Sequence, residues 1–242
     1  FNNEIKLSIS NFYNQLNELS FKLKEALSFN FESYVFNTKL NDNELLKIYL
    51  NSRQINFKEK PHFMPIIELI NHSNNGANYN FSNGISVKGN FEEEVFANYN
   101  NEIDSFDFFQ NYKFYSKQKI ALSCKLKINY KNKQISVERK NREYEIINGI
   151  KVPIVSYLNN TITFSQINIT NSIKKKQYRE FLINKLVKFS LSISQVNEFF
   201  DGLIVHNLSI LNNIIKECEK NKSFFSSQII KIAKNQISSI NN

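Results

Sequence analysis

Apolar residues near the start of the chain recur at steps of three and four positions. This spacing places them along one face of an α-helix, and the positions are Phe12, Leu16, Leu19 and Leu23. A denser apolar stretch over 45–50 follows an Asn-Asp-Asn sequence at 41–43, and such side chains often cap helix N-termini. The chain from about residue 7 to residue 50 is therefore predicted to be helical.

The spacing changes after Lys60 and Pro61 from a helical pattern to alternation. Residues 64–70 form an apolar run interrupted by Pro65, and the polar residues 71–80 are expected to turn the chain. Alternating apolar positions predict short strands near 85–87 and over 95–99. Alternation on both sides of 131–133 predicts a β-hairpin over 126–137.

Helical spacing returns in the last third of the chain. Apolar residues fall on single helical faces over 178–193, 208–218 and 229–237. The order of helices, short strands and helices predicts an α+β fold with a C-terminal helical lobe.

Composition indicates the partners and the location of the protein more than any reaction it catalyses. The net charge of +9 favours an acidic partner, which could be nucleic acid, an anionic membrane or an acidic protein face, although scattered lysines also serve solubility alone. Two distant cysteines, Cys124 and Cys218, form no disulfide framework, so a reducing, cytoplasmic location is expected. No apolar run reaches eighteen residues, and no membrane span is expected.

Several enzyme classes leave no trace in the sequence. None of the five glycines lies in a phosphate-binding loop or a dinucleotide fingerprint. The three histidines, His62, His72 and His206, lack the helical spacing of a zinc site, so no metal is expected. No nucleophile elbow of a hydrolase is visible.

One ordered set of short motifs carries most of the functional information. Asn71-His72-Ser73 closes an apolar run and, taken alone, is a polar triplet that would satisfy a loop backbone. Upstream of this triplet lie a Ser-Arg pair, Ser52 and Arg53, and an acidic residue, Glu68, two positions before Ile70. Downstream of it lie a Glu-Val-Phe strand that ends in tyrosine, Glu94 to Tyr99, and a Tyr-x-Phe segment, Tyr112 to Phe114. In this order the motifs, over 45–115, resemble the SET domain of protein lysine methyltransferases of the Rubisco large-subunit type.

The resemblance implies a SET-domain β-fold of short strands with inserted helices and a C-terminal helical lobe. Its expected divisions are a helical insert over 1–58, the C-terminal part of the SET core over 59–116, and a hairpin with a helical substrate-binding lobe over 117–242. The implied function is S-adenosylmethionine-dependent methyl transfer to a lysine of a protein substrate. Neither a metal nor a membrane takes part.

The resemblance also implies roles for individual residues. Tyr99 matches the catalytic tyrosine, and the backbone carbonyls of Ser52, Glu68 and Ile70 match positions that face the substrate lysine. The residues expected to contact the cofactor, or to line the channel beside it, are Arg53, Asn71, His72, Tyr112 and Phe114. A sulfonium methyl is already electrophilic, so such a site has to align the amine and exclude water.

Three departures from the family pattern leave alternatives open. Lys113 replaces the usual glycine of Tyr-Gly-Phe, where its side chain would crowd the cofactor or demand another backbone angle. Ser105 replaces a common asparagine, and the first SET strands with their glycine-bearing cofactor loop have no counterpart after Phe1. Either a preceding segment supplies that loop, or the chain is a catalytically inactive SET-like protein-binding module. Nucleic-acid binding, suggested by charge alone, is the weakest alternative.

Overall fold

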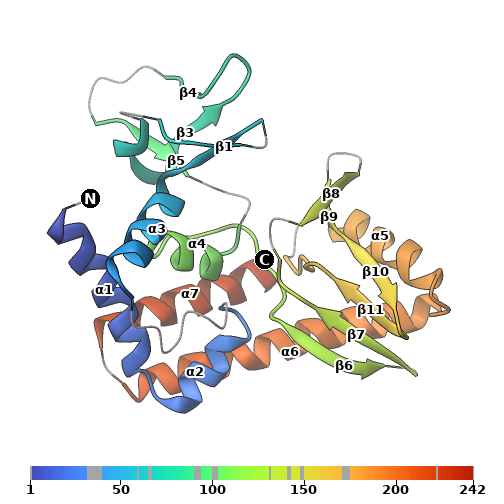
Figure 1. Ribbon diagram of the computed structural model, residues 1–242. Helices are drawn as coiled ribbons and strands as arrows, with labels where there is room; N and C mark the ends of the chain where they lie inside the picture. The colour runs from blue at the N-terminus through green and yellow to red at the C-terminus, as the bar shows by residue number, and fades with distance from the viewer. Residues whose placement is uncertain are drawn as a thin grey trace.

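The protein is represented by a computed structural model, drawn in Figure 1. The structure describes residues 2–31, 40–58, 60–64, 67–89, 94–99, 103–130, 132–140, 143–147, 150–170, 175–221 and 223–241, with the side chains of residues 68 and 175 outside this set.

Three helices open the chain, in agreement with the predicted helical region. They are α1 (Asn3–Glu18), α2 (Phe21–Ser28) and α3 (Asp42–Arg53). Each begins at a polar cap, since Asn2, Ser20 and Asn41 accept a hydrogen bond from a backbone N–H of the first turn. Residues 32–39, between α2 and α3, lie outside the described residues.

A small sheet follows, and one sequence prediction is wrong here. After the β1–β2 hairpin (Ile55–Phe57, Lys60–His62) and a 3-10 turn, η2 (Ile67–Leu69), the polar residues expected to turn the chain instead form the ten-residue strand β3 (Asn71–Asn80). It pairs antiparallel with β4 (Ser86–Val87) and parallel with β5 (Phe96–Asn98). Backbone pairing on both sides, together with side-chain bonds of its asparagines, supports this strand despite its polarity.

Gly76 permits the close approach of β3 and β5. A Cβ atom at Gly76 would lie 2.8 Å from the backbone carbonyl carbons of Phe96 and Ala97. The pairing register also shifts between His72 and Ala77, so that both face Ala97. This irregular crossing brings the segment before β3 close to the segment after β5.

Helix α4 (Ser105–Tyr112) is not among the predicted elements. Asp104 caps its N-terminus by accepting a bond from the Asp107 N–H, and the helix ends at Lys113, which adopts a left-handed conformation with φ of 67°. Its six central residues are mostly aromatic or polar types of modest helix propensity, so the caps and tertiary packing define it.

The predicted hairpin over 126–137 is confirmed and belongs to a larger sheet. Strands β6 (Leu126–Tyr130) and β7 (Lys133–Val137) pair antiparallel. The sheet order is β10-β11-β7-β6, with β11 (Thr161–Phe164) parallel to β7 and antiparallel to β10 (Val155–Leu158). A separate hairpin joins β8 (Tyr144–Ile147) to β9 (Ile150–Pro153). Strands β8 to β11 are not among the predicted elements.

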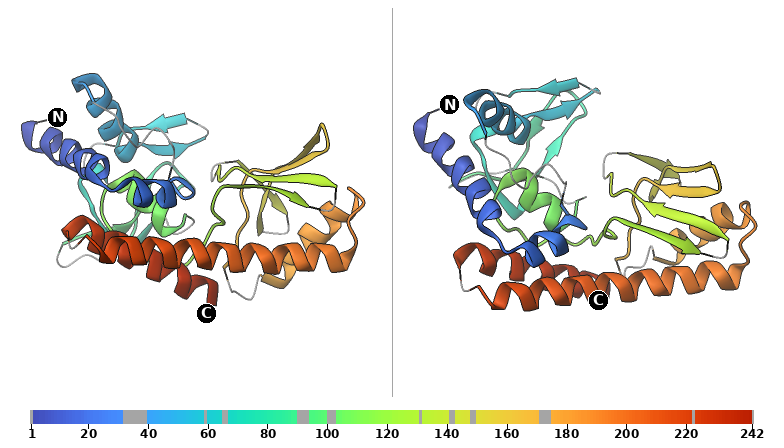
Figure 2. Two further views of the ribbon diagram at one scale, coloured as in Figure 1. Left: turned by 90° about the horizontal axis from the view of Figure 1, so that it is seen from below. Right: turned by 60° about the horizontal axis from the view of Figure 1, so that its bottom comes forward.

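Three helices close the chain: α5 (Lys175–Val187), α6 (Ile193–Glu219) and α7 (Phe224–Asn241). The prediction of one helical face over 178–193 is wrong in its last part. The chain turns after Val187 with Ser190 at φ of 66°, and α6 begins afresh at the Ser192 cap. Helix α6 runs beneath both the N-terminal helices and the β6–β7 sheet, as Figure 2 shows.

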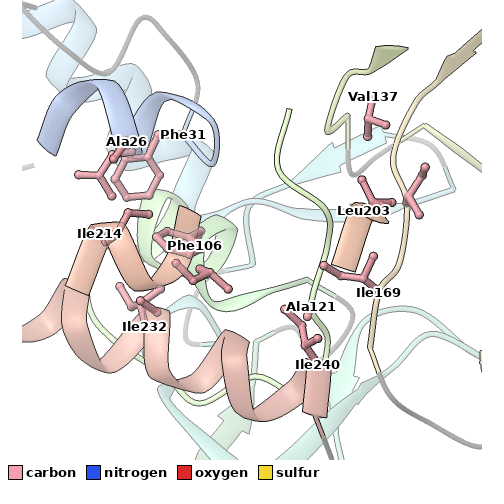
Figure 3. Packing of buried hydrophobic residues seen from close by; sticks show 14 of the residues in the cluster. Ala26, Phe31, Phe106, Ala121, Val137, Ile169, Leu203, Ile214, Ile232 and Ile240 are labelled. Carbon is pink, nitrogen blue, oxygen red and sulfur yellow. The ribbon is translucent and has the colours of Figure 1, made fainter. Parts of the chain in front are cut away.

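A single hydrophobic cluster joins these parts into an α+β fold. Phe31 and Phe106 meet edge to face with ring centroids 5.7 Å apart, and the fully buried Ile214 of α6 and Ile232 of α7 belong to the same cluster (Figure 3). The same cluster continues to Val137 and Phe164 of the larger sheet. Because α4 contributes Phe106 and Phe109 to this core, packing against the core holds the helix in position.

Candidate functional site

The Tyr99 hydroxyl donates a hydrogen bond of 2.6 Å to the backbone carbonyl oxygen of Ile70. Tyr99 directly follows β5 and Ile70 directly precedes β3, so the crossing of these strands brings them together. Both residues are predicted site residues, 29 positions apart in sequence. The hydroxyl and carbonyl oxygens are close enough to accept hydrogen bonds from two N–H groups of one amine.

His72 is held on both ring nitrogens by the protein itself. Its Nδ1 accepts a bond of 3.2 Å from the Tyr99 backbone N–H, and its Nε2 lies 2.9 Å from the Ser116 hydroxyl and 3.0 Å from the Asn74 side-chain oxygen. This pattern places the proton on Nε2. Burial lowers the pKa of His72 and is opposed by weaker hydrogen-bond effects, so the ring is neutral at physiological pH.

Asn74 and Ser116 fasten β3 to the segment after α4. The Ser116 hydroxyl donates to the Asn74 side-chain oxygen over 2.7 Å, and the Asn74 amide donates to the Lys117 carbonyl over 2.9 Å. Because the Ser116 hydroxyl directs its proton at Asn74, its oxygen accepts a hydrogen bond from Nε2 of His72 and supports the ring.

The Tyr99 ring belongs to an aromatic cluster, which we define as His72, Tyr99, Phe108, Tyr112 and Phe114. The Tyr99 and Tyr112 ring centroids lie 5.1 Å apart, and His72 and Phe108 lie 4.8 Å apart. Phe108 also contacts Tyr112 at 4.6 Å and Phe114 at 5.3 Å. Phe108 is fully buried while Phe114 is 41% exposed, so the cluster extends from the core to the surface.

The side chain of Lys113 packs on α1 beside this cluster. Its ammonium donates to the Gln110 carbonyl and lies 5.2 Å from the Phe12 ring centroid and 5.5 Å from that of Tyr13. Burial lowers the pKa of Lys113 to about 8. Lys113 has φ of 67°, a left-handed angle that glycine adopts most readily, so the lysine has a glycine-like backbone angle.

Arg53, the last residue of α3, brings a positive charge to the two tyrosines of the site. Burial is the larger effect on Tyr99 and Tyr79 and raises the pKa of both, that of Tyr79 to about 12, while Arg53 opposes it. Both phenols are therefore protonated at neutral pH.

The other predicted residues lie around this centre with less direct contacts. The Asn71 amide nitrogen donates to a carboxylate oxygen of Glu94 over 2.8 Å. The Ser52 hydroxyl donates to the Tyr49 carbonyl over 2.7 Å, within the last turn of α3. The side chain of Glu68 lies outside the described residues, and the carbonyl roles expected for Ser52 and Glu68 stay predictions.

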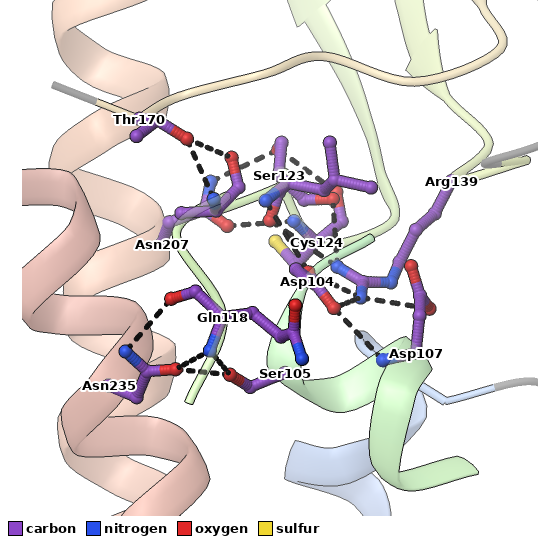
Figure 4. Close-up of polar contacts among 12 residues, drawn as sticks. Asp104, Ser105, Asp107, Gln118, Ser123, Cys124, Arg139, Thr170, Asn207 and Asn235 are labelled. Carbon is purple, nitrogen blue, oxygen red and sulfur yellow. Dashed lines mark hydrogen bonds and ion pairs between the residues drawn. The ribbon is translucent and has the colours of Figure 1, made fainter. Parts of the chain in front are cut away.

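Ser105, the first residue of α4, is bonded to a side-chain amide of another helix. Its hydroxyl donates to the side-chain oxygen of Asn235, which comes from α7 (Figure 4). The Asn235 amide also accepts from the Gln118 N–H over 2.8 Å and donates to the Gln118 carbonyl over 3.1 Å. A side-chain amide is thus present beside Ser105, supplied from another helix.

Four residues of the site are absent from the sequence predictions: Asn74, Tyr79, Phe108 and Ser116. Phe108 precedes Tyr112 by four positions, a spacing that would have indicated a shared helical face had α4 been predicted. Tyr79 was hidden in the stretch interpreted as a turn. Asn74 and Ser116 are 42 positions apart, and no local pattern indicates their contact.

Among the described residues no group of three or more His, Cys, Asp or Glu side chains is arranged to hold a metal ion. None of the helices in the described ranges is long and apolar enough to cross a membrane. No protein-family model, no curated protein and no solved structure matches the chain.

Proposed function

We propose that this protein transfers a methyl group from S-adenosylmethionine to the side-chain amine of a lysine in a protein substrate. The observation that carries the proposal is the 2.6 Å pairing of the Tyr99 hydroxyl with the Ile70 carbonyl inside the aromatic cluster. The motif resemblance supports the same function, because Tyr99, Ile70 and His72 are among the residues it singles out.

The pair of oxygen atoms can orient an amine. A lysine amine at this position would donate one N–H to the Ile70 carbonyl and another to the Tyr99 oxygen, which leaves its lone pair directed elsewhere. Because burial raises the pKa of Tyr99, its hydroxyl stays neutral and acts as a fixed dipole. Tyr99 is therefore assigned to orient the nucleophile and not to remove its proton as a phenolate.

The aromatic cluster would prepare the lysine for reaction. A lysine ammonium in water has a pKa near 10.4, and only the neutral amine is nucleophilic. Contact with Tyr112 and Phe114, whose ring centroids lie 6.4 Å apart, would strip water from the ammonium, which lowers its pKa and favours the free amine. The partial exposure of Phe114 marks the side from which the lysine would enter.

The residues around the centre fit a zwitterionic amino-acid group such as the cofactor carries. When bound, S-adenosylmethionine supplies an electrophilic methyl group that needs no metal or acid to activate it. The Arg53 guanidinium suits the carboxylate, and the Asn71 amide, now bonded to Glu94, lies next to Ile70. Since both ring nitrogens of His72 are occupied, only its backbone is assigned to the cofactor.

An inactive SET-like protein-binding module stays the alternative, and Lys113 in place of glycine is one of its grounds. Lys113 was expected to crowd the cofactor, but its ammonium lies over the rings of α1.

Two measurements test the proposal. Isothermal titration of the natural full-length chain with S-adenosylmethionine should give saturable binding with one site. Methyl transfer from radiolabelled cofactor to a library of lysine-containing peptides should label lysine and leave the same peptides with arginine in its place unlabelled. Absence of cofactor binding would remove the proposal, while binding without transfer to any peptide or protein fraction would favour the inactive module.

A further inference from the structure

Helix α4 and the turn after it supply most of the aromatic cluster. Phe108 and Tyr112 belong to the helix, and Phe114 follows its left-handed cap at Lys113. Ser116, which supports the His72 ring, comes two residues later. A shift of α4 along its axis would therefore move three of the five cluster rings relative to the Tyr99 hydroxyl.

The N-terminal end of α4 is held by a buried charge cluster (Figure 4). One guanidinium nitrogen of Arg139, Nη2, lies 2.7 and 2.6 Å from the two carboxylate oxygens of Asp104 and 3.1 Å from Asp107. Asp104 at the same time caps the helix, accepting the Asp107 N–H over 2.9 Å. The side chains of Arg139 and Asp104 are only 1% and 0% exposed.

Arg139 reaches this position from the other part of the molecule. It follows β7 of the larger sheet in a left-handed conformation, with φ of 59°. Its second terminal nitrogen, Nη1, donates to the carbonyls of Leu122 and Ser123 over 3.3 and 3.4 Å. One side chain thus joins the end of β7, the 122–123 segment and the first turn of α4.

Charge together with several N–H groups makes the arrangement specific for arginine. Two carboxylates face a single guanidinium, and burial would by itself lower the pKa of Arg139, but the attraction of Asp104 and Asp107 outweighs burial and raises it. The guanidinium is therefore charged at any pH at which the protein is folded. Lysine would bring the charge without the several N–H groups in one plane that serve these five acceptors.

We propose that Arg139 is a positioning residue, whose guanidinium fixes the first turn of α4 and thereby the distance of Phe108 and Tyr112 from the Tyr99 hydroxyl. The part of this inference that concerns methyl transfer rests on the proposed function. The fixing of α4 does not depend on it and can be measured without the cofactor.

The first experiment observes the imidazole signals by NMR, which are few because the chain has three histidines. The variants are Arg139→Gln and Arg139→Lys, and the control is Arg179→Gln, which breaks an ion pair of 2.6 Å with Asp201 between α5 and α6. Loosening α4 should admit water to His72, so that its pKa rises toward the ordinary value of about 6.5 in both Arg139 variants. The control should leave His72 unchanged.

The second experiment measures kinetics of methyl transfer on a labelled peptide. Arg139→Lys should lower kcat by about 100-fold, the order expected when reacting groups are misplaced by about 1 Å, with the KM for S-adenosylmethionine changed less than about twofold. A purely structural role would reduce the amount of active enzyme without changing the pKa of His72.

Three results would overturn the inference. A folded Arg139→Gln variant with unchanged His72 signals would show that α4 needs no guanidinium. Loss of the whole fold in both Arg139 variants would mean that the residue supports the entire protein and not α4 in particular. Altered His72 signals with wild-type kcat would remove its role in the reaction. If the wild-type chain transfers no methyl group, the proposed function fails and the NMR result alone decides the positioning.

Discussion

The backbone N–H of Tyr99 donates a hydrogen bond of 3.2 Å to Nδ1 of His72. Since His72 lies in β3 and Tyr99 follows β5, this bond fixes the end of one strand against the side chain of the other. It also sets the orientation of the imidazole, whose far nitrogen then meets Ser116. The candidate site is therefore built on a strand crossing and closed by the segment after α4.

Tyr99→Phe removes the hydroxyl while keeping the ring in the aromatic cluster. Methyl transfer is expected to fall by about 100-fold, comparable to the loss of one oriented donor in other active sites, with cofactor affinity nearly unchanged. The rate is measured with radiolabelled S-adenosylmethionine and the affinity by titration calorimetry. Tyr157→Phe, which removes an exposed hydroxyl bonded to Asn160 over 3.0 Å, is the control and should keep wild-type activity.

The half-buried, neutral imidazole of His72 predicts a specific dependence of stability on pH. Because the pKa of His72 is lower in the folded protein, the unfolded chain binds the proton first as the solution is acidified. The free energy of unfolding contributed by this ring is thus fully present above about pH 6.5 and decreases as the pH falls toward the folded pKa.

Urea unfolding of the wild type and of His72→Gln at several pH values measures this contribution. The stability difference between the two proteins should shrink on acidification from pH 7.5 to pH 5. A difference that stays constant with pH would contradict the half-buried, neutral ring.

Lys113 predicts a difference between two substitutions that both remove its ammonium. At φ of 67° a side chain costs about 1–2 kcal/mol that glycine does not. Lys113→Gly should therefore be about 1 kcal/mol more stable than Lys113→Ala, as measured by chemical denaturation. Equal stability of the two variants would mean that the left-handed turn after α4 is absent in solution.

The site residues were predictable from sequence to the extent that they belong to short motifs. Tyr99, Ile70 and His72 were identified in this way and lie together. The Asn71–Asn80 strand was missed because five of its ten residues are asparagine, which is rare in strands. Its pairing with β4 and β5 arises only in the folded chain, and the strand propensities of single residues do not predict it.

Helices were predicted where their apolar spacing is regular and missed where it is not. Helices α6 and α7 carry a sustained apolar face, whereas α4 has only eight residues, four of them aromatic. The charge cluster that holds α4 joins Asp104 to Arg139 across 35 positions. Neither residue differs in sequence from an ordinary surface charge, and only the fold reveals that both are buried.

Gly76→Ala tests the strand crossing on which the site depends. The new Cβ would lie 2.8 Å from backbone atoms of Phe96 and Ala97, which cannot yield as a flexible side chain would. Overpacking of this kind destabilises by about 1–3 kcal/mol, and separation of β3 from β5 should weaken the Tyr99–His72 bond. Thermal and urea unfolding measure the loss, and the Tyr99 amide should lose protection in hydrogen exchange.

Gly202→Ala is the matched control for this substitution. Gly202 lies within α6, and nothing lies within 4 Å of the position of its added Cβ. Alanine there should stabilise the protein by about 0.5–1 kcal/mol, because glycine is the poorer residue in a helix interior. The two changes add the same methyl group and are expected to shift the unfolding midpoint in opposite directions. A stabilising or neutral effect at Gly76 would contradict the close approach of β3 and β5.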